Sequence, residues 1–188
     1  MIIGELFPTL PEGLQLAPNF LTEPEQESLV QFFQTLPWGA VQMRGVTAKR
    51  RVVQFGWHYS FDTFHIKPAA PLPPELVPIR DRAAIFAGVE PEAFAEALVI
   101  EYSPGAGMGW HRDAPPFGII AGISLGTPSR MRFQRGEGSN RRTASIDLPP
   151  RSIYLLTGEV RSAWQHSIPP VKQLRYSLTF RTLRTTQQ

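Results

Sequence analysis

The segment LRYSLTFRTLR, residues 174–184, decides which fold this chain can adopt. Every second position from 175 to 181 is polar, and the positions between them are aromatic or aliphatic. This period of two predicts a β-strand with one polar and one apolar face. The polar face has an arginine at each end, Arg175 and Arg181, and guanidinium groups directed into a core require anions to pair with. The segment therefore predicts a buried strand beside an anionic ligand, and the alternative is a solvent-facing strand at a sheet edge.

Similar short runs, rich in β-branched or aromatic residues, precede this segment at intervals of about ten residues. They are EALVIEYSP at 96–104, FGIIAGISLG at 117–126, RMRFQRG at 130–136, TASIDLPP at 143–150 and SIYLLTG at 152–158. Such spacing predicts a sandwich, barrel or jelly roll. The stretch RRVVQFGWHYSF at 50–61 adds a strand or hairpin, and apolar spacing predicts helices within 21–39 and over 75–87. We expect an α+β, β-rich fold with helices packed on the β core.

Composition excludes several kinds of site and location. With 188 residues the chain is most simply one domain, and without cysteine it has no disulfide and no thiolate metal site. Any metal must therefore use imidazole and carboxylate ligands. The N-terminus does not resemble a secretory signal, and no apolar run approaches the roughly 18 residues that span a membrane. We expect a cytoplasmic monomer with no membrane association and no obligate protein partner.

The stretch GMGWHRDAPP, residues 107–116, contains a histidine and an aspartate two positions apart. On an extended segment His111 and Asp113 share a face. His166 follows 53 residues after Asp113, and two imidazoles with one carboxylate can occupy one face of an octahedral ferrous ion. Three positions then remain for a bidentate cosubstrate and dioxygen. The alternatives are a surface turn at 111–113 and a packed core histidine at 166.

Three stretches together resemble the AlkB family of Fe(II)- and 2-oxoglutarate-dependent dioxygenases. They are EYSPGAGMGWHRDAP at 101–115, ISLGTPSRMRF at 123–133 and WQHSIPPVKQLRYSLTFRTLR at 164–184. The resemblance implies a double-stranded β-helix, or jelly roll, over about 96–183 and a substrate-recognition lid over about 37–65, within a single domain of residues 1–188. It also implies that His111, Asp113 and His166 bind Fe(II).

The same resemblance implies a site for the cosubstrate 2-oxoglutarate, which reacts with O2. Arg175 would pair with the distal carboxylate, with the Tyr102 hydroxyl and Ser177 beside it. Arg181 would lie near the carboxylate that chelates iron. Family members often have asparagine at the positions of Ile100 and Ser177, but the main ion pair is kept, and we expect the cosubstrate to bind.

The resemblance further implies oxidative demethylation of alkylated nucleic-acid bases, in DNA or RNA, presented on a single strand or flipped from a duplex. Aromatic and basic residues suited to that substrate are Trp57, Tyr59, Arg51 and Trp110, with Arg44, Lys49 and Arg50 as further phosphate contacts. The alternative is that the aromatic residues near 57–59 belong to the core. DNA-repair members have an acidic residue where this chain has Pro115, which argues against 1-methyladenine and 3-methylcytosine as substrates.

Three other functions are compatible with parts of the sequence. The motif GISLG at 122–126 matches a serine hydrolase, with Asp147 and His166 following Ser124 in chain order. That class requires a helix directly after the serine, and TPSRMRFQRGEG is not helical in pattern. An AlkB-like oxygenase acting on protein or a small molecule, and a jelly-roll binding module without catalysis, remain open.

Overall fold

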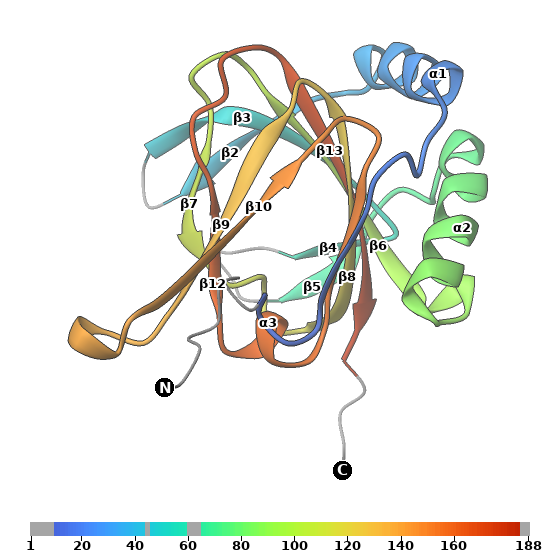
Figure 1. Cartoon of the computed structure of the whole chain (residues 1–188). Helices are drawn as coiled ribbons and strands as arrows, with labels where there is room; N and C mark the ends of the chain where they lie inside the picture. The colour runs from blue at the N-terminus through green and yellow to red at the C-terminus, as the bar shows by residue number, and fades with distance from the viewer. Residues whose placement is uncertain (1–9, 44–45, 60–64, 185–188) are drawn as a thin grey trace.

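The computed structural model describes residues 10–43, 46–59 and 65–184 (Figure 1). Its largest sheet has seven strands in the order β1, β11, β8, β13, β6, β3, β2. Their bounds are Leu14–Ala17, Ile153–Leu156, Phe117–Gly126, Arg175–Leu183, Phe94–Tyr102, Val46–Phe55 and Gly39–Met43. Every neighbouring pair is antiparallel.

A second sheet of four strands faces this one, in the order β10, β9, β12, β7. These strands are Arg142–Leu148, Ser129–Arg135, Gln165–Ile168 and Met108–His111. Buried side chains from both sheets, such as Leu98, Ile120, Phe133 and Ile168, form one apolar cluster between them. The predicted jelly roll is confirmed, and its interior is the space between the two sheets.

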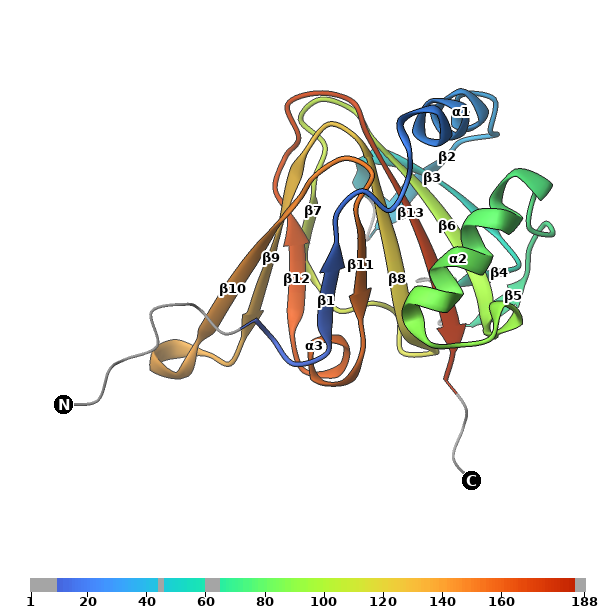
Figure 2. The same ribbon diagram turned by 45° about the vertical axis from the view of Figure 1, so that its right-hand side comes forward.

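Two helices cover the outer face of the seven-stranded sheet, as Figures 1 and 2 show from two sides. They are α1, Glu23–Gln34, and α2, Val77–Ala87, which follows a short 3-10 turn at Pro74–Leu76. Thr22 and Glu25 form a capping box at the start of α1, and Gly88 ends α2 in the left-handed conformation. Both helices lie within the predicted ranges, although α1 ends at Gln34 and α2 begins at Val77, two residues later than predicted.

The remaining elements are short. Strands β4, Trp57–Tyr59, and β5, Ile66–Pro68, form a two-stranded sheet of their own. Helix α3 is Gly158–Ser162, and single 3-10 turns occupy Pro91–Ala93 and Gly138–Asn140. None of the helices in the described ranges is long and apolar enough to cross a membrane.

Strand β13 lies in the middle of the large sheet, between β8 and β6. Its apolar residues, Tyr176, Leu178 and Phe180, are buried in the cluster beneath the two helices. Its polar residues, from Arg175 to Arg181, therefore face the interior of the jelly roll. The alternation seen in the sequence thus places two arginines inside the molecule.

Strands β2 and β3 extend the large sheet next to β6. They lie within the segment 37–65 that the family resemblance implies is a recognition lid. Most of this segment is thus hydrogen-bonded β structure at the edge of the jelly roll. Arg44, one of the basic residues considered for phosphate contact, lies outside the described residues.

Candidate active site

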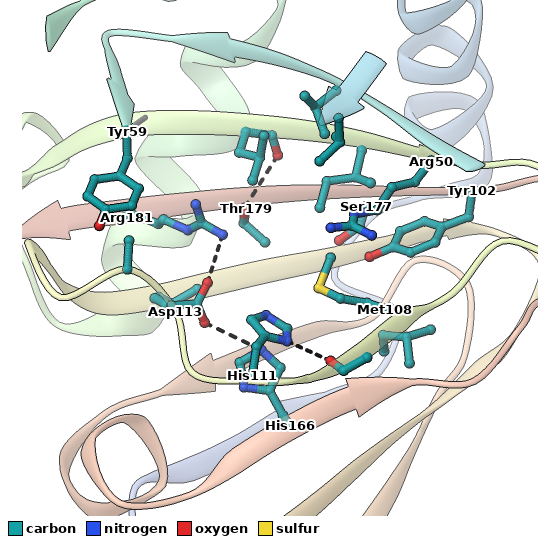
Figure 3. Close-up of a pocket in the computed structure, with 18 of the residues that line it drawn as sticks. Arg50, Tyr59, Tyr102, Met108, His111, Asp113, His166, Ser177, Thr179 and Arg181 are labelled. Atoms are coloured by element: carbon teal, nitrogen blue, oxygen red, sulfur yellow. Dashed lines mark hydrogen bonds and ion pairs between the residues drawn. The ribbon is translucent and has the colours of Figure 1, made fainter. Parts of the chain in front are cut away.

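Three ligand-type side chains meet inside the jelly roll, where β7 and β12 pair. His111 ends β7 and is the direct register partner of His166 on β12, while Asp113 lies two residues further along the chain. One ligand atom from each of the three residues lies within 4.8 Å of the others. Figure 3 shows the three side chains pointing toward one another. The cross-strand pairing thus brings together residues separated by more than fifty positions.

The protonation states of this cluster suit a divalent metal. Burial by itself raises the pKa of Asp113, but the charges of Arg181 and of the two histidines outweigh it, and the pKa falls to about 2. Burial lowers the pKa of His166 to about 4. His111 Nδ1 lies 2.9 Å from the carbonyl of Gly109, so this nitrogen donates and Nε2 stays free to coordinate. At neutral pH Asp113 is thus a carboxylate and His166 a neutral imidazole, and together with the imidazole of His111 they form the donor set of non-haem Fe(II) sites.

Arg181 on β13 holds the carboxylate of the cluster in place. Its Nη2 donates to Asp113 Oδ1 at 2.8 Å, and its Nη1 donates to Glu96 Oε2 at 2.9 Å. The opposite Asp113 oxygen, Oδ2, lies 3.4 Å from His166 Nε2. One oxygen of Asp113 is therefore bound to Arg181, and the other faces the histidines.

The other end of β13 presents a buried cation without a carboxylate partner. Arg175 is 1% exposed and donates to the hydroxyl of Ser124, at 3.2 and 3.3 Å, and no carboxylate of the described residues pairs with it. Its guanidinium lies over the Tyr102 ring, 5.0 Å from the ring centroid, and its Nη1 is buried without a hydrogen-bond partner. A buried guanidinium with an unused donor fits the carboxylate of a bound ligand.

Both ends of β13 open into one pocket of about 420 Å³. The residues that line it include the three of the metal-type cluster and the inward residues of β13. Its other walls are mostly apolar and come from both sheets: Val52, Leu98, Ile100, Met108, Ile120, Met131, Tyr154 and Ile168. The pocket can hold a small dicarboxylate between Arg175 and the cluster and still leave space for a further group.

Comparison with known proteins identifies the family. Residues 13–181 match the family model of the 2OG-Fe(II) oxygenase superfamily, where 2OG is 2-oxoglutarate. The chain belongs to this superfamily.

Curated proteins that carry AlkB-homologue names are similar to it. It is 30% identical over 181 residues to a protein of Arabidopsis thaliana named "Alkylated DNA repair protein ALKBH8 homolog", covering 84% of this chain and 51% of the relative. It is 28% identical over 173 residues to the Xenopus tropicalis "tRNA (carboxymethyluridine(34)-5-O)-methyltransferase alkbh8", covering 89% of this chain and 27% of the relative. The chain thus spans about half or less of the length of these two proteins.

A solved structure agrees in fold. The structure titled "The structure of OsALKBH1" superposes with a TM-score of 0.69 at 15% identity, covering 93% of this chain and 98% of that chain. At this identity the likeness shows the fold alone. The 2OG-Fe(II) oxygenase superfamily, to which the family model assigns the chain, implies Fe(II), 2-oxoglutarate and O2 as cofactors.

The serine-hydrolase alternative is wrong for this oxygenase. Ser124 lies inside strand β8, is fully buried, and accepts hydrogen bonds from Arg175. No strand-to-helix turn exposes its hydroxyl, because β8 continues to Gly126 and β9 begins at Ser129. The GISLG motif contributes instead to the wall around the buried arginine.

Two of the residues predicted to contact substrate line the oxygenase pocket. Tyr59 is buried beside Phe117, with 6.4 Å between the ring centroids. Trp110 is 39% exposed and therefore lies at the rim of the pocket, with the guanidinium of Arg132 over its ring at 5.1 Å. Both positions are compatible with contact to a substrate group that enters the pocket.

The other two predicted substrate residues do not line it. Arg51 forms a two-pronged ion pair with Glu101, at 2.8 and 2.9 Å, and its guanidinium lies over the ring of Trp38. These contacts hold it on the opposite face of β3 from the pocket. Trp57 is half-buried on β4 and also lies outside the pocket lining. The pocket lining does not support Arg51 and Trp57 as contacts to a substrate group inside it, because the direction of each side chain depends on which face of its strand meets the interior.

Arg50, which the sequence suggested only as a further phosphate contact, lines the pocket, and so does His58. The alternation along β3 could have shown that Arg50 and Arg51 face opposite sides. It could not have shown which of them points inward.

Proposed function

We propose that this oxygenase removes methyl groups from alkylated bases of nucleic acid by oxidation, with the base on a single strand or flipped from a duplex. The observation that supports this most is a metal-type cluster at the base of an apolar pocket that has an exposed aromatic residue, Trp110, at its rim. A flat, mostly apolar group can enter such a pocket and present one carbon to the metal. The name of the Arabidopsis relative, an alkylated DNA repair protein, supports the same substrate class.

In this proposal His111, Asp113 and His166 hold the iron. When bound with 2-oxoglutarate and dioxygen, the iron supplies an oxidant that hydroxylates a C–H bond while the cosubstrate is converted to succinate and carbon dioxide. Arg181 keeps Asp113 ionised and oriented. A hydroxymethyl group formed on a base nitrogen then leaves as formaldehyde, which regenerates the unmodified base.

Arg175 binds the distal carboxylate of 2-oxoglutarate in this proposal. The unused Nη1 of Arg175 and the buried Tyr102 and Ser177 beside it offer hydrogen-bond donors to that carboxylate. Arg181 lies at the metal end, near the carboxylate that would chelate the iron, but its terminal nitrogens already contact Asp113 and Glu96. Its unpartnered Nε remains for the cosubstrate.

We assign substrate contact to Tyr59 and Trp110 and keep the segment 37–65 as the proposed recognition lid of a single domain. His58 and Tyr59 from this segment line the pocket next to the metal-type cluster. The substrate would thus be enclosed between the 57–59 strand and the tryptophan at the rim.

The test is mass spectrometry of methylated single-stranded DNA, duplex DNA and RNA oligomers incubated with Fe(II), 2-oxoglutarate and ascorbate. The panel includes 1-methyladenine and 3-methylcytosine, which the Pro115 position argues against, alongside other N-methylated bases. Succinate is measured in parallel, and His111→Ala serves as the inactive control. Loss of a methyl mass from any oligomer supports the proposal.

Succinate without loss of a methyl group from any oligomer would refute the nucleic-acid proposal. The substrate would then be sought among proteins and small molecules. If neither product forms, the jelly roll acts as a binding module without catalysis.

A further inference from the structure

We infer that Arg50 is a second cationic residue for the distal carboxylate of 2-oxoglutarate, so that two arginines from different strands hold the cosubstrate. The inference rests on the proposed cosubstrate site and is independent of which substrate is oxidised. Arg50 comes from β3, at the edge of the large sheet, whereas Arg175 comes from its centre.

The pairing of β3 with β6 directs Arg50 inward. Arg50 is the register partner of Tyr102, and Arg51 is the register partner of Glu101. The ion pair between Arg51 and Glu101 holds both of these side chains on the outer face of the sheet. Because successive residues of a strand point to opposite faces, Arg50 and Tyr102 both face the pocket, and both line it.

Arg50 and Arg175 both lie near the hydroxyl of Tyr102. Figure 3 shows Arg50 reaching from its strand toward Ser177 and the hydroxyl of Tyr102. Burial raises the pKa of this phenol, whereas the positive charges of Arg175 and Arg50 each lower it. Arg175 lies directly over the ring of Tyr102. The phenol therefore lies within the field of two guanidinium groups.

Three carboxylates near the pocket, among the residues that the structure describes, pair with arginines other than Arg175. Glu101 binds Arg51 on the outer face, and Glu96 and Asp113 bind Arg181. Arg181 is six residues from Arg175 along β13, which is about 20 Å at 3.3 Å per residue. Two like charges at one end of a mostly apolar pocket repel each other, and a bound carboxylate between them removes that repulsion. The distal carboxylate of 2-oxoglutarate has the negative charge that would offset this repulsion.

This arrangement has two consequences. A 2-oxo acid without a distal carboxylate would form no ion pair with either guanidinium group and would bind more weakly than 2-oxoglutarate. The cosubstrate would also connect β3 to β13, so its binding should slow amide hydrogen exchange in β3, a strand at the sheet edge.

The test is calorimetric titration of the Mn(II)-loaded protein, without nucleic acid, using 2-oxoglutarate and 2-oxovalerate. The second ligand has the same chain length but lacks the distal carboxylate. We expect Arg50→Gln to weaken 2-oxoglutarate binding about tenfold to thirtyfold and to change 2-oxovalerate binding less than about twofold. Arg50→Lys keeps the charge without the planar fork, and we expect an intermediate loss.

Two further variants separate the possible outcomes. Arg130→Gln removes the same charge from an exposed residue, which pairs with Asp147 of β10. We expect it to leave the affinities for 2-oxoglutarate and 2-oxovalerate unchanged. Arg175→Gln tests the proposed cosubstrate site itself. If Arg175→Gln weakens 2-oxoglutarate binding and Arg50→Gln does not, the inference about Arg50 is wrong while the cosubstrate site stands.

Equal weakening of both ligands by Arg50→Gln would also overturn the inference, because Arg50 would then shape the pocket rather than bind the distal carboxylate. The same holds if Arg50→Gln weakens only the binding of a methylated oligonucleotide, measured by fluorescence anisotropy, since the anion it serves would then be a phosphate. Hydrogen exchange provides a second readout: 2-oxoglutarate should protect β3 in the natural chain and fail to do so in Arg50→Gln.

Discussion

Replacing Arg161 with methionine should destabilise the fold and disturb the segment that follows Asp113. Arg161 lies on α3, and its guanidinium is buried against the turn at 114–118. Its Nη2 donates to the carbonyls of Ala114 and Phe117 at 2.9 and 2.6 Å, and its Nε donates to the carbonyl of Gly118 at 3.0 Å. One side chain therefore fixes the chain directly after a proposed iron ligand.

The magnitude follows from these three bonds. A hydrogen bond to a charged group contributes about 1.5 kcal/mol at the lower end of its range, so three contribute about 4–5 kcal/mol. The lower end applies because the Ala114 carbonyl also accepts from the Phe117 N–H, and the Phe117 carbonyl also accepts from Arg184. Removing a buried charge stabilises the folded state by about 1–2 kcal/mol, because the charge no longer has to be desolvated. The net loss of unfolding free energy is about 3 kcal/mol, or about 6–12 °C in Tm for a chain of this length.

Urea unfolding followed by circular dichroism measures this loss, with Arg184→Met as the matched control. Arg184 is exposed and donates to the same Phe117 carbonyl, so its replacement should reduce the unfolding free energy by less than about 1 kcal/mol. Mn(II) affinity, measured by calorimetry, should fall in Arg161→Met and be retained in Arg184→Met. If the two variants unfold at the same urea concentration, the three buried hydrogen bonds do not hold this segment and the reasoning fails.

Three other substitutions test the site. His111→Ala should abolish both Mn(II) binding and succinate formation, whereas His58→Ala, which changes a histidine of the same pocket outside the cluster, should keep metal affinity; equal losses in a calorimetric titration would argue against the proposed ligand set. Arg175→Met should lower 2-oxoglutarate affinity about 100-fold. It should leave the unfolding free energy of the ligand-free protein unchanged or raise it by about 1–2 kcal/mol, because it removes a buried guanidinium that has no carboxylate partner among the described residues. A large loss of stability in a urea titration would contradict this. In Glu96→Gln, Asp113 is the one carboxylate left to pair with Arg181, which then competes more strongly with the metal for Asp113, so Mn(II) affinity should fall about tenfold. An unchanged affinity would show that Glu96 does not influence metal binding.

Much of the fold could be predicted from local sequence. The alternation at 175–181 and the apolar spacing within 21–39 and over 75–87 depend on interactions within a few residues, and each segment has the type of secondary structure that its pattern predicts. The metal-type cluster was also accessible, because the residue types and their spacing are restrictive even without a structure. The structure adds that His166 is the register partner of His111.

What only the tertiary structure decided is which side of each strand meets the interior. Alternation shows that Arg50 and Arg51 face opposite ways, but both assignments fit the sequence equally well. The choice depends on the pairing of β3 with β6, which sets Arg51 against Glu101 and Arg50 against Tyr102. A shift of one residue in that pairing would exchange the two arginines. Strand alternation is a local property, whereas the buried face is set by contacts between segments about fifty residues apart, and for that reason the sequence alone could not decide which of the two arginines lines the pocket.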